Sequence, residues 1–98
     1  MTKKVAKGTQ KQTIARKDGK IIVMLTLDEF SSHYTLNEWD AEEHKTIVER
    51  RYEKKDYKKA LSDYDLLQTI ILNTSFDEIT ENVTESYRFV KLEDGDAD

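Results

Sequence analysis

The pattern of hydrophobic and polar positions changes several times along the chain, and its first clear feature lies near the N-terminus. Two β-prone runs, QTIAR and IIVMLTL, are separated by Asp18-Gly19. The Asp-Gly pair supplies the positive φ values that a tight hairpin turn requires. We therefore predict a β-hairpin with strands over residues 12–17 and 20–27.

A helical pattern follows the polar connector after the hairpin. The segment TLNE, which begins at Thr35, fits a capping box in which Thr accepts from the Glu backbone and Glu reaches back. A helix turns by 100° per residue, and on that basis a helix beginning at Thr35 has one apolar side. Trp39 lies outside this side, near its edge. The residues on this side are Leu36, His44, Ile47 and Val48.

A second apolar face follows, and it points in another direction. Its members are spaced by helical intervals, and they are Tyr57, Ala60, Tyr64, Leu67 and Ile71. This face is turned by about 200° from the first, so one straight helix cannot bury both against one core. We therefore predict two helices with a break at residues 54–56. Asp56 is then the N-cap of the second helix, which runs to about Leu72 and ends in the polar turn 73–75.

The remaining segments complete the expected fold. Residues 76–82 form a short helical turn or a loop, and the β-branched and aromatic segment 86–92 forms a third strand that pairs with the hairpin. Residues 1–10 are expected to be a flexible basic arm, and residues 93–98 a disordered acidic tail. The sequence thus predicts one α+β domain over residues 11–92, with a β-hairpin, a two-helix hairpin and a third strand on a small antiparallel sheet (ββααβ).

Composition argues against most kinds of enzyme. The 98 residues suffice for one small domain, and without Cys there is no disulfide, no thiolate nucleophile and no cysteine zinc site. Three glycines form no phosphate-binding loop, and two His residues without Cys make a poor metal site. The longest apolar run, IIVML, is too short to cross a bilayer, and we expect no secretory signal because no apolar stretch follows the charged N-terminal residues. We expect a cytoplasmic protein without enzymatic activity, cofactor, metal or membrane contact.

The charge distribution suggests a function through binding. The net charge is −4, but residues 1–20 are strongly basic, so the rest of the chain is strongly acidic. An acidic face can occupy a DNA-binding cleft on another protein by placing carboxylates where phosphates would lie. Acidic residues that serve only solubility are the simpler alternative. The expected partner-binding face comprises Asp28, Glu29, Glu38, Glu42, Glu43, Asp77, Glu78 and Glu81.

The segment RRYEKKDYKK, residues 50–59, supports a different hypothesis. Basic side chains interleaved with tyrosines are typical of nucleic-acid contacts, since cations neutralise phosphates and aromatic rings stack on bases. The same cations are also favoured at the C-terminal end of the expected first helix, where they would only be solvated. The residues of this alternative nucleic-acid site are Lys3, Lys4, Lys7, Arg50, Arg51, Lys54 and Lys55.

Two resemblances bear on these hypotheses. The segment YEKKDYKKALSDYDLL, residues 52–67, resembles half of a tetratricopeptide repeat, which implies a helical hairpin. The short chain, the absence of Cys and Pro, and the abundance of Lys, Asp, Asn, Ile and Tyr resemble small accessory or early proteins of phages that infect low-GC bacteria. That resemblance implies a protein that inhibits or redirects a host macromolecule.

The favoured hypothesis is therefore a non-enzymatic binding protein. It has an acidic, DNA-mimicking surface, through which it inhibits a host nucleic-acid-associated protein. The alternative is a small nucleic-acid-binding protein. A third hypothesis is a structural component that works as an oligomer, and the sequence is compatible with a monomer or a homodimer.

Overall fold

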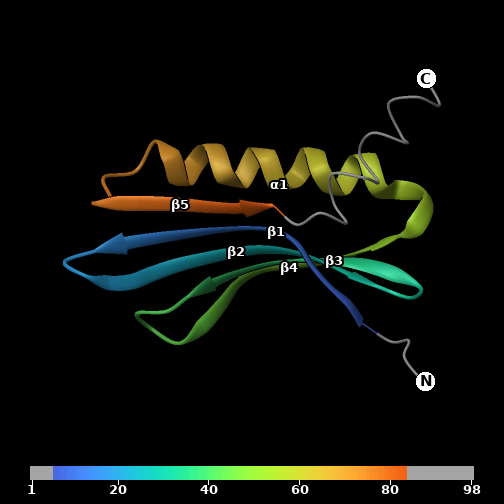
Figure 1. Cartoon of the computed structure of the whole chain (residues 1–98), viewed down its shortest axis with the longest axis horizontal. Coiled ribbons are helices and arrows are strands. Elements are labelled where there is room, and N and C mark those ends of the chain that lie inside the picture. The colour runs from blue at the N-terminus through green and yellow to red at the C-terminus, as the bar shows by residue number, and fades with distance from the viewer. Residues whose placement is uncertain (1–5, 84–98) are drawn as a thin grey trace.

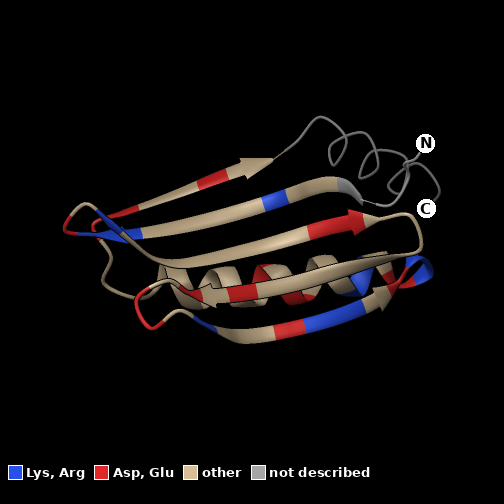
Figure 2. Ribbon diagram, turned by 90° about the horizontal axis from the view of Figure 1, so that it is seen from below, with Lys and Arg blue, Asp and Glu red and all other residues tan. Residues whose placement is uncertain are grey.

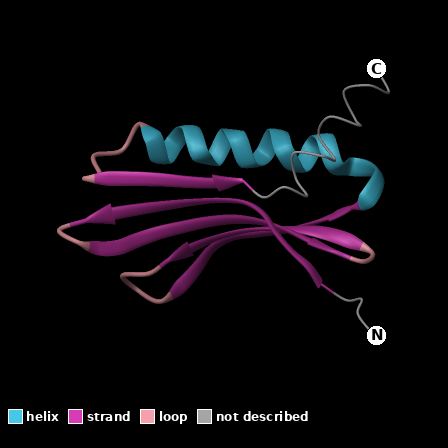
Figure 3. Ribbon diagram, viewed as in Figure 1, coloured by secondary structure: helices cyan, strands magenta, loops and turns pink. Residues whose placement is uncertain are grey.

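The computed structural model describes residues 6–83, and within this range one α-helix lies along one face of an antiparallel sheet (Figures 1 and 3). The strands are joined in the order β4-β3-β2-β1-β5. The elements are β1 (Ala6–Lys17), β2 (Lys20–Phe30), β3 (His33–Asp40), β4 (Lys45–Glu53), the 3-10 turn η1 (Lys54–Asp56), α1 (Tyr57–Leu72) and β5 (Glu78–Val83).

The chain builds the sheet as a meander and then crosses it once. Strands β1 to β4 follow one another as antiparallel neighbours. Helix α1 then carries the chain from the edge strand β4 across one face to the opposite edge, where β5 pairs antiparallel with β1. No described helix covers the other face, which we call the open face (Figure 1).

The core lies between the sheet and α1. In β2 the side chains of Leu25 and Leu27 are fully buried, and they point to the same face because alternate residues of a strand do so. From the helix, Ala60 and Tyr64 are fully buried against them at a spacing of four residues. The core is thus a single layer of apolar side chains between one helix and one sheet face.

The predicted β-hairpin is confirmed. Strands β1 and β2 pair antiparallel up to Lys17 opposite Lys20, and the two turn residues Asp18 and Gly19 have φ values of 54° and 78°. Both values lie in the left-handed region, as a two-residue hairpin turn requires. The strands are longer than predicted, since residues 6–10 of the expected basic arm lie in β1.

The prediction of a first helix is wrong, and with it the two-helix ββααβ fold. The segment expected to be helical forms β3 and β4, joined by a turn in which His44 has a φ of 57°. In β3 burial alternates, with Tyr34 and Leu36 buried on the face that α1 covers. Strand β4 lies at the edge of the sheet and exposes most of its side chains, so a charged sequence is tolerated there. The helical spacing of Leu36 and Val48 was therefore coincidental.

The predicted second helix is confirmed as α1. The break at residues 54–56 exists as the turn η1 between a strand and a helix, and Asp56 occupies the N-cap position without a side-chain capping hydrogen bond. The helix ends at the predicted polar turn 73–75, of which Asn73 is the C-cap. The helical hairpin implied by the tetratricopeptide resemblance is absent, because Tyr52 lies in β4.

The C-terminal part of the chain differs from the expectation where it is described. The segment expected to be a helical turn or a loop contains the strand β5. The predicted strand over residues 86–92, the acidic tail over residues 93–98 and the first five residues of the basic arm lie outside the described residues.

Candidate partner-binding surfaces

Three chain reversals meet at one end of the sheet, and all three carry carboxylates (Figure 2). They are the β1–β2 turn, the β3–β4 turn and the segment between α1 and β5. Two hydrogen bonds hold this last segment against the first hairpin, from Asp77 N to Arg16 O at 2.9 Å and from Asp18 N to Asp77 Oδ2 at 2.6 Å. We call this region the acidic end. Its acidic residues are Asp18, Asp40, Glu42, Glu43, Asp77 and Glu78, and the basic residues Arg16, Lys17, Lys20 and Lys45 lie beside them.

Two aspartates at the acidic end hold the backbone in place. Asp77 accepts the hydrogen bond from the β1–β2 turn, and the Oδ1 atom of Asp40 accepts from the backbone NH groups of Glu42 and Glu43 at 2.9 and 3.0 Å. Hydrogen bonds from backbone NH groups to a side-chain carboxylate hold a turn in one conformation, although the turn is neither helix nor strand. Lys45 lies 3.1 Å from Glu43, an exposed pair that contributes little to stability. The carboxylates of this end thus sit on ordered turns and at the ends of strands.

Four of the predicted acidic residues lie at the acidic end and four lie elsewhere. Glu42, Glu43, Asp77 and Glu78 are exposed there, as the predicted face requires. The structure does not bring the remaining four, Asp28, Glu29, Glu38 and Glu81, to this end.

Glu29 is a structural residue rather than a surface carboxylate. It is only 7% exposed, and its Oε2 atom lies 2.6 Å from the Nζ atom of Lys54. The same ammonium group lies 4.8 Å from the centre of the Tyr34 ring, a cation–π distance. Burial, together with the charge of Glu29, raises the pKa of Tyr34 to about 12. The Glu29–Lys54 ion pair joins β2 to the turn η1.

Of the other three displaced carboxylates, one lies on the open face and two lie on the helix-covered face. Asp28 accepts a hydrogen bond from Thr9 at 2.7 Å on the open face. Glu38 lies on the helix-covered face, opposite Leu25, where desolvation raises its pKa. Glu81 lies 3.3 Å from Lys11.

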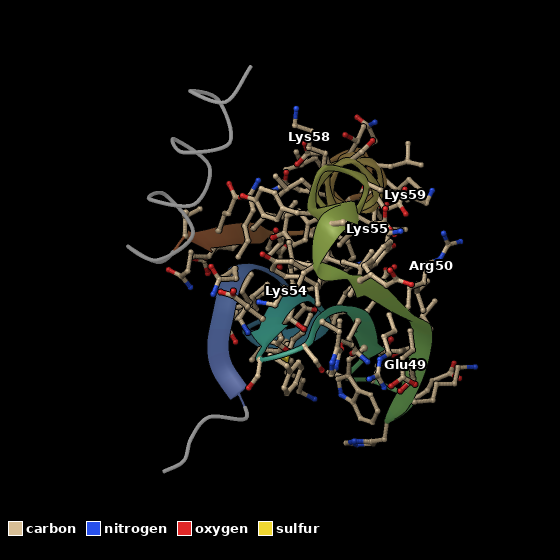
Figure 4. The ribbon with its side chains drawn as sticks, turned by 90° about the vertical axis from the view of Figure 1, so that its right-hand side faces the viewer. Glu49, Arg50, Lys54, Lys55, Lys58 and Lys59 are labelled. Carbon is tan, nitrogen blue, oxygen red and sulfur yellow. The ribbon has the colours of Figure 1, made fainter. Side chains whose placement is uncertain are left out.

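Several residues of the predicted basic site form ion pairs with acidic residues of the same chain. Arg50 lies 3.5 Å from Asp63, Lys55 lies 3.7 Å from Glu53, and Lys54 bonds Glu29. The alternation of a strand places Arg50 and Arg51 on opposite faces of the sheet. Figure 4 shows Lys54 near the middle of the molecule and Arg50 at its outer edge.

The other predicted basic residues add little to that site. Lys3 and Lys4 lie outside the described residues, and Lys7 lies in β1. The predicted basic residues therefore do not form one surface within residues 6–83.

Asp63 forms a cluster that the sequence did not reveal. Its Oδ2 atom accepts from the Tyr52 hydroxyl at 2.7 Å and lies 3.5 Å from Arg50 and 3.9 Å from Lys59. Burial first, and then the hydrogen bond and charge of Asp63, raise the pKa of Tyr52 to about 12. A cavity of about 70 Å³ opens beside this cluster, lined by Leu36, Val48, Arg50, Asp63, Leu66 and Leu67. Helix α1 is thus joined to β4 by a polar contact beside an apolar hollow.

The open face carries a short apolar row across three strands. Ile14 lies opposite Met24, which lies opposite Trp39, and all three are half-buried. At the other end of this face the rings of Phe30 and His33 stack, with centroids 4.8 Å apart. The sequence could not reveal this row, because Trp39 was assigned to a helix.

An open hollow of about 380 Å³ lies beside His33. It is lined by Ser32, His33, Arg51, Tyr52 and Glu53. Desolvation first, and then the charges of Arg51 and Lys54, lower the pKa of His33. This shift favours the neutral imidazole.

Comparisons with known proteins identify no family for this fold. No protein-family model, no curated protein and no solved structure matched the chain. Among residues 6–83, no three His, Asp or Glu side chains come together as metal ligands. Within the same range, no helix is both long and apolar enough to cross a membrane.

Proposed function

We propose that the chain is a non-enzymatic protein-binding module whose acidic end contacts a basic protein surface. The observation that carries this proposal is the meeting of three turns, far apart in the sequence, at one end of the sheet. Glu42 and Glu43 are exposed there on a turn whose backbone is held by Asp40, and Glu78 is exposed at the start of β5, next to the turn that Asp77 holds. Ordered loops lose less conformational entropy on binding than flexible ones, so this surface is suited to recognition.

The chemistry of the surface favours a nucleic-acid-associated protein as the partner. Carboxylates attract a basic surface over a long range and speed association, and proteins that bind phosphates present such surfaces. Binding there would exclude the nucleic acid, so the module inhibits or redirects its partner. The compositional resemblance to phage accessory proteins supports a host protein as that partner, in the cytoplasm of a bacterium.

The test begins with a pull-down from bacterial lysate using the full chain. The captured protein is then purified, and its nucleic-acid binding is measured with and without the module. Wild-type module should release the nucleic acid, and E42Q/E43Q/E78Q should do so at about tenfold higher concentration, since it removes three attracting charges. The control E53Q/D56N/D65N makes the same change in net charge away from the acidic end, and it should behave as the wild type.

Three outcomes contradict the proposal. They are the recovery of no specific partner, a partner whose nucleic-acid binding is unaffected, and equal behaviour of the two triple variants. A gel shift of nucleic acid by the module itself below about 100 mM salt would favour the alternative hypothesis, because phosphate contacts are strongest at low salt.

A further inference from the structure

Strand β4 forms one edge of the sheet, and its sequence is self-complementary. Among the described strands it pairs only with β3, so one side of its backbone is left for another strand. Glu49 and Arg51 alternate with Val48, Arg50 and Tyr52 along this strand. Glu49 and Arg51 lie on the open face, opposite Asn37 and Thr35 of β3 respectively. Val48, Arg50 and Tyr52 lie on the face that α1 covers.

We propose that two copies of the chain pair antiparallel through β4, with Arg50 at the two-fold axis, and form one continuous ten-stranded sheet. In this register Glu49 lies opposite Arg51 of the second copy, and the two-fold axis repeats that pair. On the helix-covered face Val48 lies opposite Tyr52 of the second copy. Directly opposed charges of unlike sign stabilise an antiparallel strand pair, and so do apolar and aromatic neighbours.

Neighbouring registers are less favourable. When the two-fold axis passes through Glu49, that carboxylate faces its own copy, and when it passes through Arg51, that guanidinium does so. Like charges in directly opposed positions destabilise a strand pair. In the proposed register Arg50 faces its own copy, but each guanidinium has the Asp63 carboxylate at 3.5 Å to compensate its charge. The side chains of β4 thus select one register.

Exposed apolar side chains flank this edge. Leu66 is 64% exposed and Ile70 58% exposed, and they follow Asp63 at helical spacing along the side of α1 that faces β4. Leu66 also lines the cavity beside Val48. Ile47, in β4 itself, is 49% exposed. Figure 4 shows Arg50 at this edge of the molecule, with Lys59 above it on α1 and Glu49 below it. A second copy would cover part of this apolar surface, which a monomer leaves in water.

The pairing is independent of the proposed function, because it uses the β4 edge rather than the carboxylates of the acidic end. It gives each dimer two acidic ends, one on each copy. The test is therefore the oligomeric state of the isolated chain, measured by sedimentation velocity over a wide concentration series at low salt.

Charge exchange at two positions tests the register. E49R alone places Arg opposite Arg, and R51E alone places Glu opposite Glu, so each variant should dimerise about tenfold more weakly than the wild type. The double variant E49R/R51E should recover dimerisation. An equimolar mixture of the two single variants should form a heterodimer, since both cross-strand pairs are then of unlike charge. D65R, which makes the same charge change as E49R but on the side of α1 that faces Lys11 of β1, should dimerise as the wild type.

A cysteine scan provides a second measurement that does not depend on charge. The chain has no Cys, so R50C introduces a single thiol that faces its own copy at the two-fold axis. Directly opposed Cα atoms of an antiparallel pair lie about 4.5–5.5 Å apart, which suits a disulfide. Mild oxidation should cross-link R50C and leave the control E53C without a cross-link, although E53C still pairs non-covalently. A wild-type chain that stays monomeric, single charge variants that dimerise normally, or equal cross-linking of R50C and E53C would overturn the proposal.

Discussion

The hydroxyl oxygens of Thr13 in β1 and Tyr64 in α1 lie 2.5 Å apart, and both side chains are fully buried. Gln68 donates a further hydrogen bond to Thr13 at 3.1 Å, and the Lys11 ammonium lies 4.9 Å from the centre of the Tyr64 ring. One polar network therefore ties the middle of the helix to the interior strand β1 within a mostly apolar core.

Removing either hydroxyl should destabilise the fold. Y64F and T13V should each lower the free energy of unfolding by about 1–3 kcal/mol, because each leaves a buried hydroxyl or amide partner with fewer hydrogen bonds. The double variant should lose less than the sum of the two, by about 1 kcal/mol. Urea denaturation measures all three values, and the exposed change T46V serves as the control. Strict additivity would contradict a direct bond between the hydroxyls.

The Asp63 cluster predicts unequal effects at its members. D63A should cost about 1–2 kcal/mol of stability, since it leaves the buried Tyr52 hydroxyl without its acceptor. K59M should change stability by less than about 0.5 kcal/mol, because that ion pair is exposed and long. The same variants can be followed by ultraviolet titration of the tyrosines. D63A should lower the pKa of Tyr52 from about 12, although burial keeps it above 10.

Glu38 predicts a pH dependence of stability. Desolvation raises its pKa in the folded chain above the ordinary value of 4.5. The folded state then binds more protons than the unfolded state, so this residue lowers stability as the pH rises from 4.5 through its folded pKa. E38Q should be more stable than the wild type at pH 7 and equal to it below pH 4. Denaturation series at both pH values measure the difference, and equal stabilities at pH 7 would show that the carboxyl is well solvated.

The β3–β4 turn predicts a stabilising substitution. His44 has a φ of 57°, a conformation that costs most L-residues about 1 kcal/mol and that glycine adopts freely. H44G should therefore raise the free energy of unfolding by about 0.5–1 kcal/mol. The greater conformational entropy that glycine gives the unfolded chain reduces this gain. H44V should lower it, because a β-branched side chain suits this region least. The reverse order of the two variants would contradict a left-handed residue in this turn.

The parts of the fold that the sequence predicted are those decided by neighbouring residues. Asp18-Gly19 determines the first hairpin locally, and the helical spacing of Ala60 and Tyr64 determines α1. The shift of the apolar face at residues 54–56 was a real signal, but it marked a change from strand to helix. Strand β4 could not be recognised by its own pattern, because an edge strand has one neighbour and exposes most of its side chains.

The candidate surface could be predicted only in part, for a similar reason. Glu42 and Glu43 are adjacent to each other in the sequence, as are Asp77 and Glu78, so each pair was recognised as acidic. That the two pairs share one end follows from the crossing of α1, which no local pattern reveals. The displaced Glu29 looked like any other acidic residue, because its partner Lys54 lies 25 positions away.

The crossing of α1 also dictates an order of events when the chain folds. Strands β1 to β4 can pair through short hairpins, whereas Arg16 must wait for Glu78, far along the chain. Contacts between such distant residues form late, because a long loop must close before they are gained. We therefore expect the meander to form first and β5 to dock last, so the acidic end is the final part of the molecule to be assembled.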